Sequence, residues 1–469
     1  MMQANRMWYR GLVCLLIGAL VLTACSSTAE PEVIEKQVTQ VVIETVVVAG
    51  TPEIVEKEVT QVVTVEVEKV VTPTPPPPSE PVTITWATWG GAAQADLYEQ
   101  AIEKFHAAQD MIRVENINSA SVADHVQKVQ TMLGGGTPPD VIMLGGETVP
   151  AFAAFGATQP IDAFVEADAS FDEHDYFGIT LDAMRYDGKL WGLPKDFNIT
   201  ILYYNKSMFD EAGLEYPTRD WDQEMFLEAA QALTKREDGR VVQYGFADSP
   251  LNMWFWIWQN GGEVFDNDLD PKEMLLDQPA ALETVQWYFD LALVHGVMPT
   301  LPELMQSGGQ QELFASGRVA MLADLRGATQ VLNQITDFEW GMSELPKGKE
   351  KRATVFNWAG YSIGTGSAHP EEAWAFLKWV AGPDGVPIFV EGGNALPALW
   401  DLMEDPELGV EQPFIDSLPY ARPFFASPKW GDLQPVLMQY LQLMAVGEMS
   451  VEEGVPLMKQ EADAILVGE

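Results

Sequence analysis

The stretch Val82-Thr83-Ile84-Thr85-Trp86 opens the part of the chain that decides its fold. Apolar and polar residues alternate along it, which predicts a half-buried strand ending at Trp89-Gly90-Gly91. Apolar residues then recur at helical spacing from Leu97 to Phe105, and three further segments follow: a strand at 112–117, a helix through 126–132 and a strand at 141–144. Strands that alternate with helices in this way predict an α/β fold with a parallel sheet.

The length of this body predicts two lobes. Helical periodicity continues along the chain, at 221–233, 279–295, 370–380 and 433–444. About 390 residues follow the start of the first strand, more than a single hydrophobic core usually holds. We therefore expect the body, residues 81–469, to form two α/β lobes.

A low-complexity segment lies ahead of the body. Its residues 33–42 recur in nearly the same order as residues 54–63, and a proline-rich run follows at Pro73–Pro78. The segment is rich in valine and almost free of aromatic residues, and proline runs favour extended polyproline II. We interpret residues 25–80 as a tether, with a small β-hairpin or a coiled-coil stalk as the alternative.

The start of the chain resembles a bacterial lipoprotein signal. Arg6 and Arg10 precede an apolar run at 11–22, which is shorter than the ~20 residues that span a bilayer. The tetrapeptide Leu22-Thr23-Ala24-Cys25 then places a cysteine directly after a small residue. The resemblance implies that residues 1–24 are a signal peptide and that Cys25 carries the lipid. We expect a protein on the outer side of the cell membrane, held there by this anchor only.

Composition narrows the classes of ligand and chemistry. The chain has 69 acidic and 27 basic residues and a formal charge of −42, which argues against nucleic acid and against binding to an anionic lipid surface. Polyanionic ligands are disfavoured, while neutral and cationic ones stay open. Besides Cys14 in the signal and Cys25 there is no cysteine, so a disulfide, a zinc cluster and a cysteine nucleophile are excluded from the mature domain. We expect a monomer.

No catalytic or metal site emerges from the motifs. Gly360-Tyr361-Ser362-Ile363-Gly364 matches the G-x-S-x-G nucleophile motif, whose serine needs a later Asp or Glu and then a His. Only His369 follows, with no acidic residue between it and Ser362, so we interpret the match as chance. The five histidines are scattered, none at the i, i+4 spacing of a metal pair. We predict neither a cofactor nor an enzyme.

Tryptophan is the remaining signal of a ligand site. The chain has 15, and several of them, including Trp89, Trp254 and Trp358, stand beside loops or polar residues. Indole rings stack on the apolar faces of sugars, although each single Trp is more often part of a core. Trp254 and Trp258 share one helical face and Trp256 lies opposite, so only part of this group can face a ligand.

Several runs together resemble one family. They are Gln130-Thr131-Met132-Leu133 with residues 136–141, Tyr186-Asp187-Gly188-Lys189-Leu190-Trp191-Gly192-Leu193-Pro194 with Leu202-Tyr203-Tyr204-Asn205-Lys206, Phe314-Ala315-Ser316-Gly317-Arg318-Val319-Ala320-Met321, and Ala373-Trp374-Ala375-Phe376-Leu377-Lys378. Spread over residues 82–422, they resemble the bacterial extracellular solute-binding proteins that serve ABC transporters, in the sugar-binding, maltose-binding-like group (family 1).

This resemblance implies a periplasmic-binding-protein-like fold, with a hinge and a ligand cleft between the lobes. Lobe 1 would comprise about 82–195 and 358–405, and lobe 2 about 196–357 and 406–469. Trp254 would stack on sugar, with Trp89 or Trp358 as further candidates. The implied ligand-binding residues are Trp89, Gly90, Gly146, Glu147, Asp196, Asn198, Trp254, Asp324, Arg326, Trp358 and Asn394.

The function expected from this resemblance is capture of a mono- or oligosaccharide and its delivery to an ABC permease. Two alternatives stay open. The same fold could bind a polyamine or another small cation, which the acidic composition permits. Less favoured is an envelope-anchored glycan hydrolase, since no catalytic constellation is visible.

Overall fold

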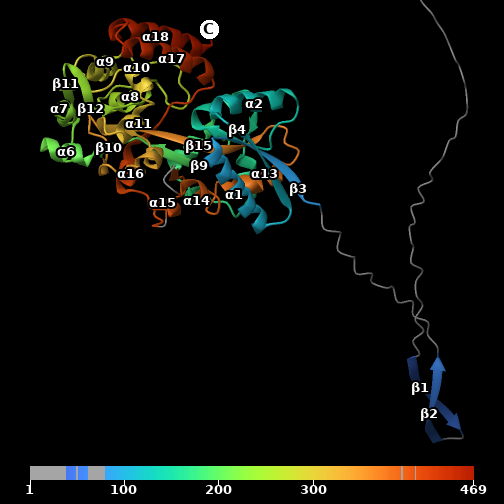
Figure 1. Cartoon of the computed structure of the whole chain (residues 1–469). Helices are drawn as coiled ribbons and strands as arrows, with labels where there is room; N and C mark the ends of the chain where they lie inside the picture. Colours follow the sequence, from blue (N-terminus) through green and yellow to red (C-terminus); the bar gives the residue numbers. More distant parts are fainter. Residues whose placement is uncertain (1–37, 49–50, 62–79, 392–394, 407, 469) are drawn as a thin grey trace, which may run out of the picture. The chain divides into compact units, whose positions relative to one another are not determined.

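The computed structural model describes residues 38–48, 51–61, 80–391, 395–406 and 408–468. The chain separates into two units, Met1–Ser79 and Glu80–Glu469 (Figure 1). Three predictions fall on residues outside the described ranges: the signal peptide with Cys25, the proline-rich run, and Asn394 as a ligand-binding residue.

The first unit contains a β-hairpin, the alternative to a tether for this part of the chain. β1 (Val38–Val48) and β2 (Thr51–Gln61) pair antiparallel. The two copies of the repeat meet each other, because Thr39 stands opposite Thr60 and Val38 opposite Gln61. β-Branched residues favour this extended pairing.

The second unit is built on two sheets, of which the larger has eight strands. Its main order is β16-β9-β15-β5-β3-β4, and β6 and β17 both pair with β15. The parallel arrangement holds for β4, β3 and β5, whereas β15 runs antiparallel to β5 and β9, so the sheet is mixed. Its strands are β3 (Val82–Trp89), β4 (Ile112–Ser119), β5 (Val141–Gly145), β6 (Thr158–Gln159), β9 (Leu193–Ile199), β15 (Thr354–Gly364), β16 (Leu396–Pro397) and β17 (Ala421–Pro423).

Helices cover the faces of this sheet, so its central strands are buried and apolar, as in β5. Trp86 of β3 lies at the centre of the core, with the rings of Tyr98, Tyr361 and Phe376 edge-on around it. The helices of this half are α1 (Ala92–Ala108), α2 (Val122–Gly134), α3 (Val149–Ala154), α4 (Asp162–Ala167), α5 (Gly178–Asp182), α13 (Pro370–Val380), α14 (Val386–Val390) and α15 (Trp400–Met403).

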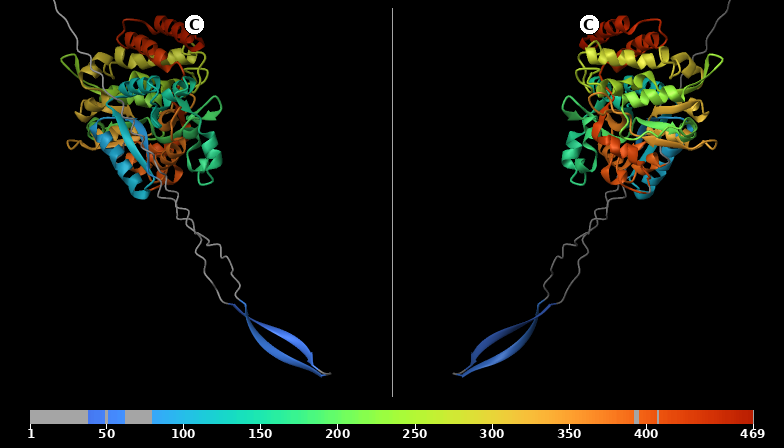
Figure 2. Two further views of the ribbon diagram at one scale, coloured as in Figure 1. Left: turned by 90° about the vertical axis from the view of Figure 1, so that its right-hand side faces the viewer. Right: turned by 90° about the vertical axis from the view of Figure 1, so that its left-hand side faces the viewer.

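The second sheet has five strands in the order β11-β12-β13-β10-β14. They are β10 (Ile201–Asn205), β11 (Lys235–Glu237), β12 (Arg240–Ala247), β13 (Val319–Asp324) and β14 (Trp340–Ser343). The helices of this half are α6 (Lys206–Ala212), α7 (Gln223–Leu233), α8 (Met253–Gln259), α9 (Pro279–Leu293), α10 (Leu301–Gln306), α11 (Gln310–Ala315), α12 (Thr329–Leu332), α16 (Gln412–Ser417), α17 (Trp430–Ala445) and α18 (Val451–Val467). The C-terminal pair α17 and α18 packs on α9 (Figures 1 and 2).

The chain crosses between the two sheets more than once. Thr200 alone separates β9 of the larger sheet from β10 of the smaller, and the chain returns between β14 and β15. The crossing strands are tied together, because the Thr200 amide donates to the carbonyl of Val355 (3.2 Å) and the Thr354 hydroxyl donates to the carbonyl of Thr200 (2.5 Å). This two-lobed α/β architecture agrees with the predicted fold class, while the residue boundaries of the lobes stay predictions.

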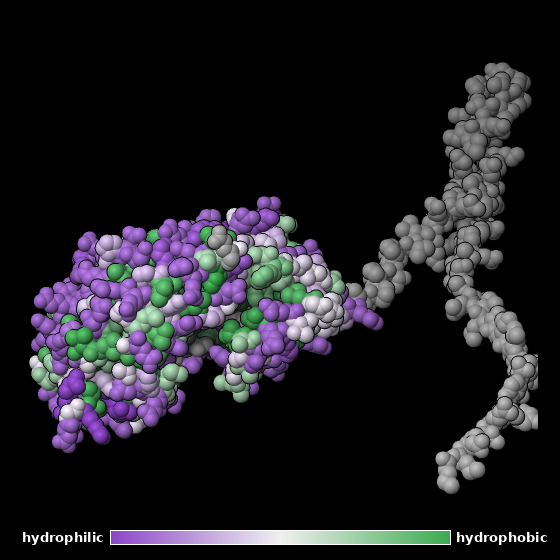
Figure 3. All heavy atoms as spheres, turned by 90° about the horizontal axis from the view of Figure 1, so that it is seen from above, coloured by the Kyte–Doolittle hydropathy of each residue, from purple (hydrophilic) through white to green (hydrophobic). Residues whose placement is uncertain are grey.

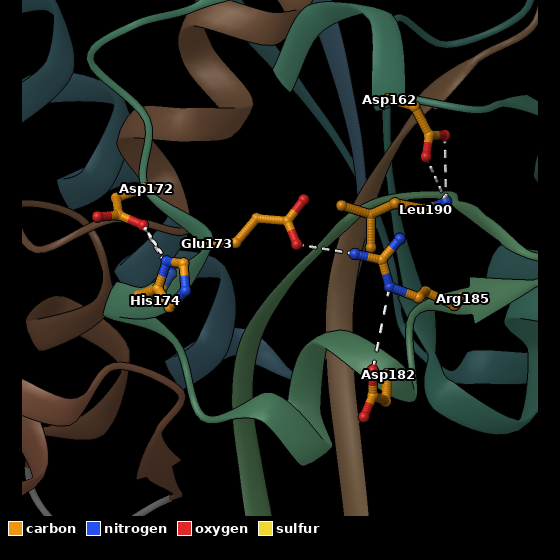
Figure 4. Close-up of polar contacts among 7 residues, drawn as sticks. All are labelled: Asp162, Asp172, Glu173, His174, Asp182, Arg185 and Leu190. Carbon is orange, nitrogen blue, oxygen red and sulfur yellow. Dashed lines mark hydrogen bonds and ion pairs between the residues drawn. The ribbon is translucent and has the colours of Figure 1, made fainter. Parts of the chain in front are cut away.

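Polar contacts hold the segment between β6 and β9 in place (Figure 4). The Arg185 guanidinium lies between the carboxylates of Glu173 (2.8 Å) and Asp182 (4.0 Å). The Leu190 amide donates to the Asp162 carboxylate (3.2 Å). Arg185 and Leu190 belong to a small hairpin, β7 (Arg185–Tyr186) with β8 (Lys189–Leu190), so these contacts fix the chain just before it enters β9.

The face of the second unit that Figure 3 shows is largely hydrophilic, with scattered apolar patches. Over the described residues, none of the helices combines the length and apolarity needed to cross a membrane.

Candidate functional site

A cleft of about 370 Å³ draws its lining from both sheets. Glu147 follows β5 and Asn357 lies on β15, both in the larger sheet, whereas Asp324 ends β13 of the smaller one. The interlobe cleft, as we call it, is lined by Glu147, Ser249, Asn252, Gln310, Asp324, Leu325, Asn357, Phe424, Trp430 and Gln434. A pocket at such a junction of lobes is where small ligands usually bind.

Glu147 is placed by the turn that ends β5. Gly145 closes the strand, and the 3-10 turn Gly146–Thr148 follows, fixed by a hydrogen bond from the Thr148 hydroxyl to the carbonyl of Gly145 (2.7 Å). Burial raises the pKa of the Glu147 carboxyl, against the opposing effect of its own backbone N–H. No ion pair with Glu147 occurs among the described residues, so its charge is desolvated without a compensating cation.

Asp324 is a buried carboxylate that accepts three hydrogen bonds. It is 5% exposed, and its Oδ2 accepts hydrogen bonds from Nε2 of Gln310 (2.9 Å) and of Gln311 (3.1 Å). Its Oδ1 accepts from the amide of Leu325 (2.7 Å). Burial raises the pKa of Asp324 although these donors oppose the shift. The carboxylate therefore also fixes the amide of Gln310 at the cleft wall.

Asp248 plays a similar part for Asn252. Asp248 is the first residue after β12 and is 2% exposed. Its Oδ1 accepts hydrogen bonds from Nδ2 of Asn252 (2.7 Å) and from the backbone amide of Ser249 (2.8 Å). Its other oxygen, Oδ2, is buried without a hydrogen-bond partner. Burial raises the pKa of Asp248 well above the usual range, and the charge of Asp324 adds to the shift.

Two aromatic rings form the apolar part of the cleft wall. Phe424 follows β17 and Trp430 begins α17, and their rings meet edge to face with centroids 5.8 Å apart. Phe425 packs on both of them and ties the pair to the core. An apolar surface beside carboxylates and amides can pack against the C–H face of a sugar ring while its hydroxyls are bound.

Glu147 and Asp324 both line the cleft, and Gly146, directly before Glu147, packs against Trp358. Trp358 stacks on Phe356 (5.3 Å) and is 5% exposed. A Cβ at Gly146 would stand 1.9 Å from Cε2 of this indole, so only glycine fits there. Trp358 thus supports the turn that carries Glu147.

Four other predicted residues lie on strands of the larger sheet or at their ends. Trp89 and Gly90 end β3, where Trp89 is half-buried and its ring lies 5.1 Å from that of His125. Asn198 of β9 stands opposite Asn357 of β15, which lines the cleft. Asp196 is buried in an ion pair with Lys195. None of these four lines the cleft as the structure describes it, and their contact with ligand stays a prediction.

Trp254 and Arg326 are engaged inside the protein. Trp254 is fully buried, as are Trp256 and Trp258, because α8 is surrounded by core on every side. A ligand cannot reach it in this conformation, so its predicted stacking would need a rearrangement. Arg326 is 2% exposed and donates from Nε to Glu411 (2.8 Å) and from Nη1 to the carbonyl of Ala395 (2.7 Å).

The sequence missed most of the cleft residues. The polar residues that it missed lie on helices, turns and one strand, and nothing in their local pattern marks them: Ser249, Asn252, Gln310, Asn357 and Gln434. The one signal in the sequence that points to Phe424 and Trp430 is the clustering of aromatic residues around Arg422.

The alternative chemistries gain no support from the geometry. Ser362 lies within β15 and is fully buried, whereas a nucleophile motif needs a strand-to-helix turn that exposes the serine. The described residues hold no group of three or more His, Cys, Asp or Glu side chains that could bind a metal.

A second hollow, of about 640 Å³, lies wholly on the side of the smaller sheet. Trp287 and Leu227 form its apolar part, and its rim is mainly acidic, with Lys347 and Lys349. No residue of the larger sheet contributes to it. It is therefore distinct from the interlobe cleft.

The family model described as "Bacterial extracellular solute-binding protein" matches residues 90–387, which include all five strands of the smaller sheet, most strands of the larger one and most of the cleft residues. The chain belongs to this family. A binding protein of Brucella abortus (strain 2308) is 24% identical to this solute-binding protein over 353 residues, or 73% of this chain and 83% of its own. A maltotriose-binding protein of Pyrococcus abyssi is 23% identical, over 67% of this chain and 68% of its own.

Solved structures show the same fold. The substrate-binding protein Lmo0181 from Listeria monocytogenes, in complex with cycloalternan, superimposes with a TM-score of 0.72 at 24% identity. The match covers 83% of this chain and 99% of that one.

Proposed function

We propose that this solute-binding protein captures a carbohydrate in the interlobe cleft and delivers it to the permease of an ABC importer. The observation that carries the proposal is the cleft itself, in which Phe424 and Trp430 stand beside Glu147, Asn252 and Asp324. Family membership supports delivery to a permease, and a sugar as the ligand is supported by a relative named a maltotriose-binding protein and by a solved structure of the same fold in complex with cycloalternan.

Binding would act on an equilibrium between open and closed lobes. The two strand crossings near Thr200 and Val355 are the places where the lobes can bend. A ligand that contacts both lobes favours the closed form only by the difference in its affinity for the two forms. A micromolar dissociation constant corresponds to about −8 kcal/mol, of which the aromatic contact supplies only part.

A thermal-shift screen tests the proposal. The protein, without residues 1–24 and with Cys25 replaced by Ser, is heated with mono- and oligosaccharides, polyamines and amino acids. Binding to the native state must raise the unfolding midpoint. We expect shifts with one or more sugars and none with polyamines or amino acids. The absence of any shift across a broad sugar panel contradicts the proposal.

A substitution in the aromatic wall ties binding to this cleft. Phe424→Ala removes part of the apolar surface, and we expect a loss of sugar affinity of roughly tenfold, or about 1.4 kcal/mol, by calorimetric titration. Trp287→Ala is the matched control, because its half-buried ring lines the other hollow. Equal losses in both variants would place the ligand elsewhere.

We further propose a lipid anchor at Cys25, which rests on the resemblance of residues 22–25 to a lipoprotein signal. Expressed at full length in a bacterial host, the protein should incorporate radiolabelled palmitate and sediment with membranes. Cys25→Ser should abolish both, whereas Cys14→Ser should leave them unchanged. Label retained in Cys25→Ser would contradict the anchor.

A further inference from the structure

The interlobe cleft carries negative charge with no cation to balance it. Glu147 and Asp324 line it, Asp248 lies directly behind Ser249 and Asn252, and none of the ten lining residues of the described chain is Lys, Arg or His. None of the three carboxylates takes part in an ion pair of the described residues.

Two basic residues beside predicted site residues are engaged elsewhere. Arg326, two positions from Asp324, donates to Glu411 and to the carbonyl of Ala395. Lys195 pairs with Asp196 and lies 4.9 Å from the centre of the Phe389 ring. A positive charge in the cleft must therefore come from the ligand.

The cleft amides are turned so that they present acceptors. Nδ2 of Asn252 donates to Asp248, and Nε2 of Gln310 donates to Asp324. In these two hydrogen bonds the amide NH₂ groups face the carboxyl groups, which leaves the carbonyl oxygens of both amides for other partners. The wall thus offers a ligand acceptor oxygens from two amides in addition to the Glu147 carboxylate.

Glu147 has the most free capacity of the three acidic groups. Asp324 already accepts three hydrogen bonds, and Asp248 is screened from the cleft by Asn252 and Ser249. Glu147 lines the cleft and is desolvated, as the raised pKa of its carboxyl indicates, and its only hydrogen-bond donor in the described chain is its own backbone. An ammonium group would restore the interactions that this carboxylate loses on burial.

We infer that the ligand is an amino sugar whose protonated amine binds the Glu147 carboxylate while its ring packs on Phe424 and Trp430. The inference rests on the proposed function and names the class of its ligand. A hydroxyl at the same place would also donate to this carboxylate, but an ammonium adds the attraction of a second full charge, which is stronger in a partly buried cleft than in bulk water. The amine should therefore improve affinity about tenfold or more over a hydroxyl at the same position.

Calorimetric titration of matched sugars tests this inference. Glucose, galactose and mannose are each compared with the 2-amino-2-deoxy sugar and with its N-acetylated form, as monosaccharides and as β-1,4 dimers. Glucose 6-phosphate is included as an anionic sugar. We expect the free amine of at least one series to bind about tenfold or more tighter than both neutral forms, and the phosphate not to bind.

Glu147→Gln isolates the charge, because it keeps the size of the side chain. We expect it to abolish the preference for the amine while neutral sugars keep their affinity within about threefold. Glu283→Gln is the matched control, since Glu283 lines the other hollow and pairs with Lys349 (2.5 Å). Unfolding midpoints of both variants check that the fold is intact.

The outcomes separate the two proposals. If neutral sugars bind as tightly as their amino forms, if only sugars outside these series bind, or if Glu147→Gln keeps the preference, the inference is wrong and carbohydrate capture stands. If no carbohydrate binds at all, or if simple diamines bind as tightly as amino sugars, the proposed function fails together with it.

Discussion

At the scale of single residues, two charged residues that were both predicted to bind the ligand, Glu147 and Arg326, have different surroundings in the structure. Glu147 follows a strand end and lines the cleft, as the resemblance implied, although its contact with a ligand stays a prediction. Arg326 follows the end of β13 but turns into the protein, where a carboxylate and backbone carbonyls engage it. Sequence places both residues at sheet edges, whereas the direction of each side chain depends on distant partners such as Glu411.

The buried position of Arg326 gives a stability prediction. Arg326→Ala breaks the pair with Glu411, whose side chain is 31% exposed, and leaves the carbonyl of Ala395 without this donor; an unsatisfied buried acceptor costs about 1–3 kcal/mol. We expect that loss in denaturant unfolding. Lys235→Ala, in the exposed pair with Glu211 (2.7 Å), should cost less than about 1 kcal/mol. Similar costs for the two variants would contradict the structural role of Arg326.

Asp248 gives a pH-dependent prediction. Burial raises the pKa of its carboxyl above that in the unfolded chain, so the folded protein binds the proton more strongly. Its stabilising contribution is then fully present below the unfolded pKa and is lost as pH rises through the folded pKa. Asp248→Asn stays neutral and can still accept from Asn252, so it should raise the unfolding midpoint at pH 8 by a few degrees and much less at pH 4. A larger gain at pH 4 would contradict this assignment.

At the scale of elements, periodicity located helices well. The predicted helix at 370–380 coincides with α13. The helix predicted at 221–233 corresponds to α7, which begins two residues later than predicted, at Gln223. Asp222 caps it by accepting hydrogen bonds from the backbone amides of Glu224 and Met225. The α8 segment was harder to interpret, since a helix buried on all sides has no polar face from which a ligand-facing side could be inferred. Phe424 and Trp430 were missed because β17 and α17 reach the cleft only through tertiary packing.

The turn after β5 gives a prediction about packing. Gly146→Ala would drive a methyl group into the Trp358 indole, and overpacking of this kind costs about 1–3 kcal/mol. We expect a lower midpoint in chemical denaturation and weaker sugar binding, because the displaced turn carries Glu147. Gly134→Ala at the end of α2 is the control, since a Cβ there meets no atom within 4 Å. A midpoint unchanged by Gly146→Ala would show that the indole can move freely.

At the scale of the whole molecule, alternation of strands and helices was enough to predict the α/β class but not the order of the strands. The sequence indicated a parallel sheet, and this holds for β3 with its neighbours β4 and β5. β15 lies more than two hundred residues from β5 in the chain and still pairs with it antiparallel. No local pattern encodes such a distant pairing.

Lobe closure is the prediction at this scale. With saturating sugar, the radius of gyration of residues 80–469 in small-angle X-ray scattering should fall, because the lobes turn toward each other about the crossings near Thr200. A sugar that gives no thermal shift should leave the radius unchanged. Tight binding without a change in radius would mean that the cleft binds its ligand without closure.

The central place of β15 in the larger sheet has a consequence for biogenesis. The sheet has β15 between β9 and β5, so its two halves have no direct pairing until residues 354–364 have left the ribosome and crossed the membrane. The first two hundred residues alone would expose unpaired edges of both halves. The larger sheet of such a chain can be completed only after β15 has emerged, so the lobe built on it should form late, after the strands of the smaller sheet have already been synthesised.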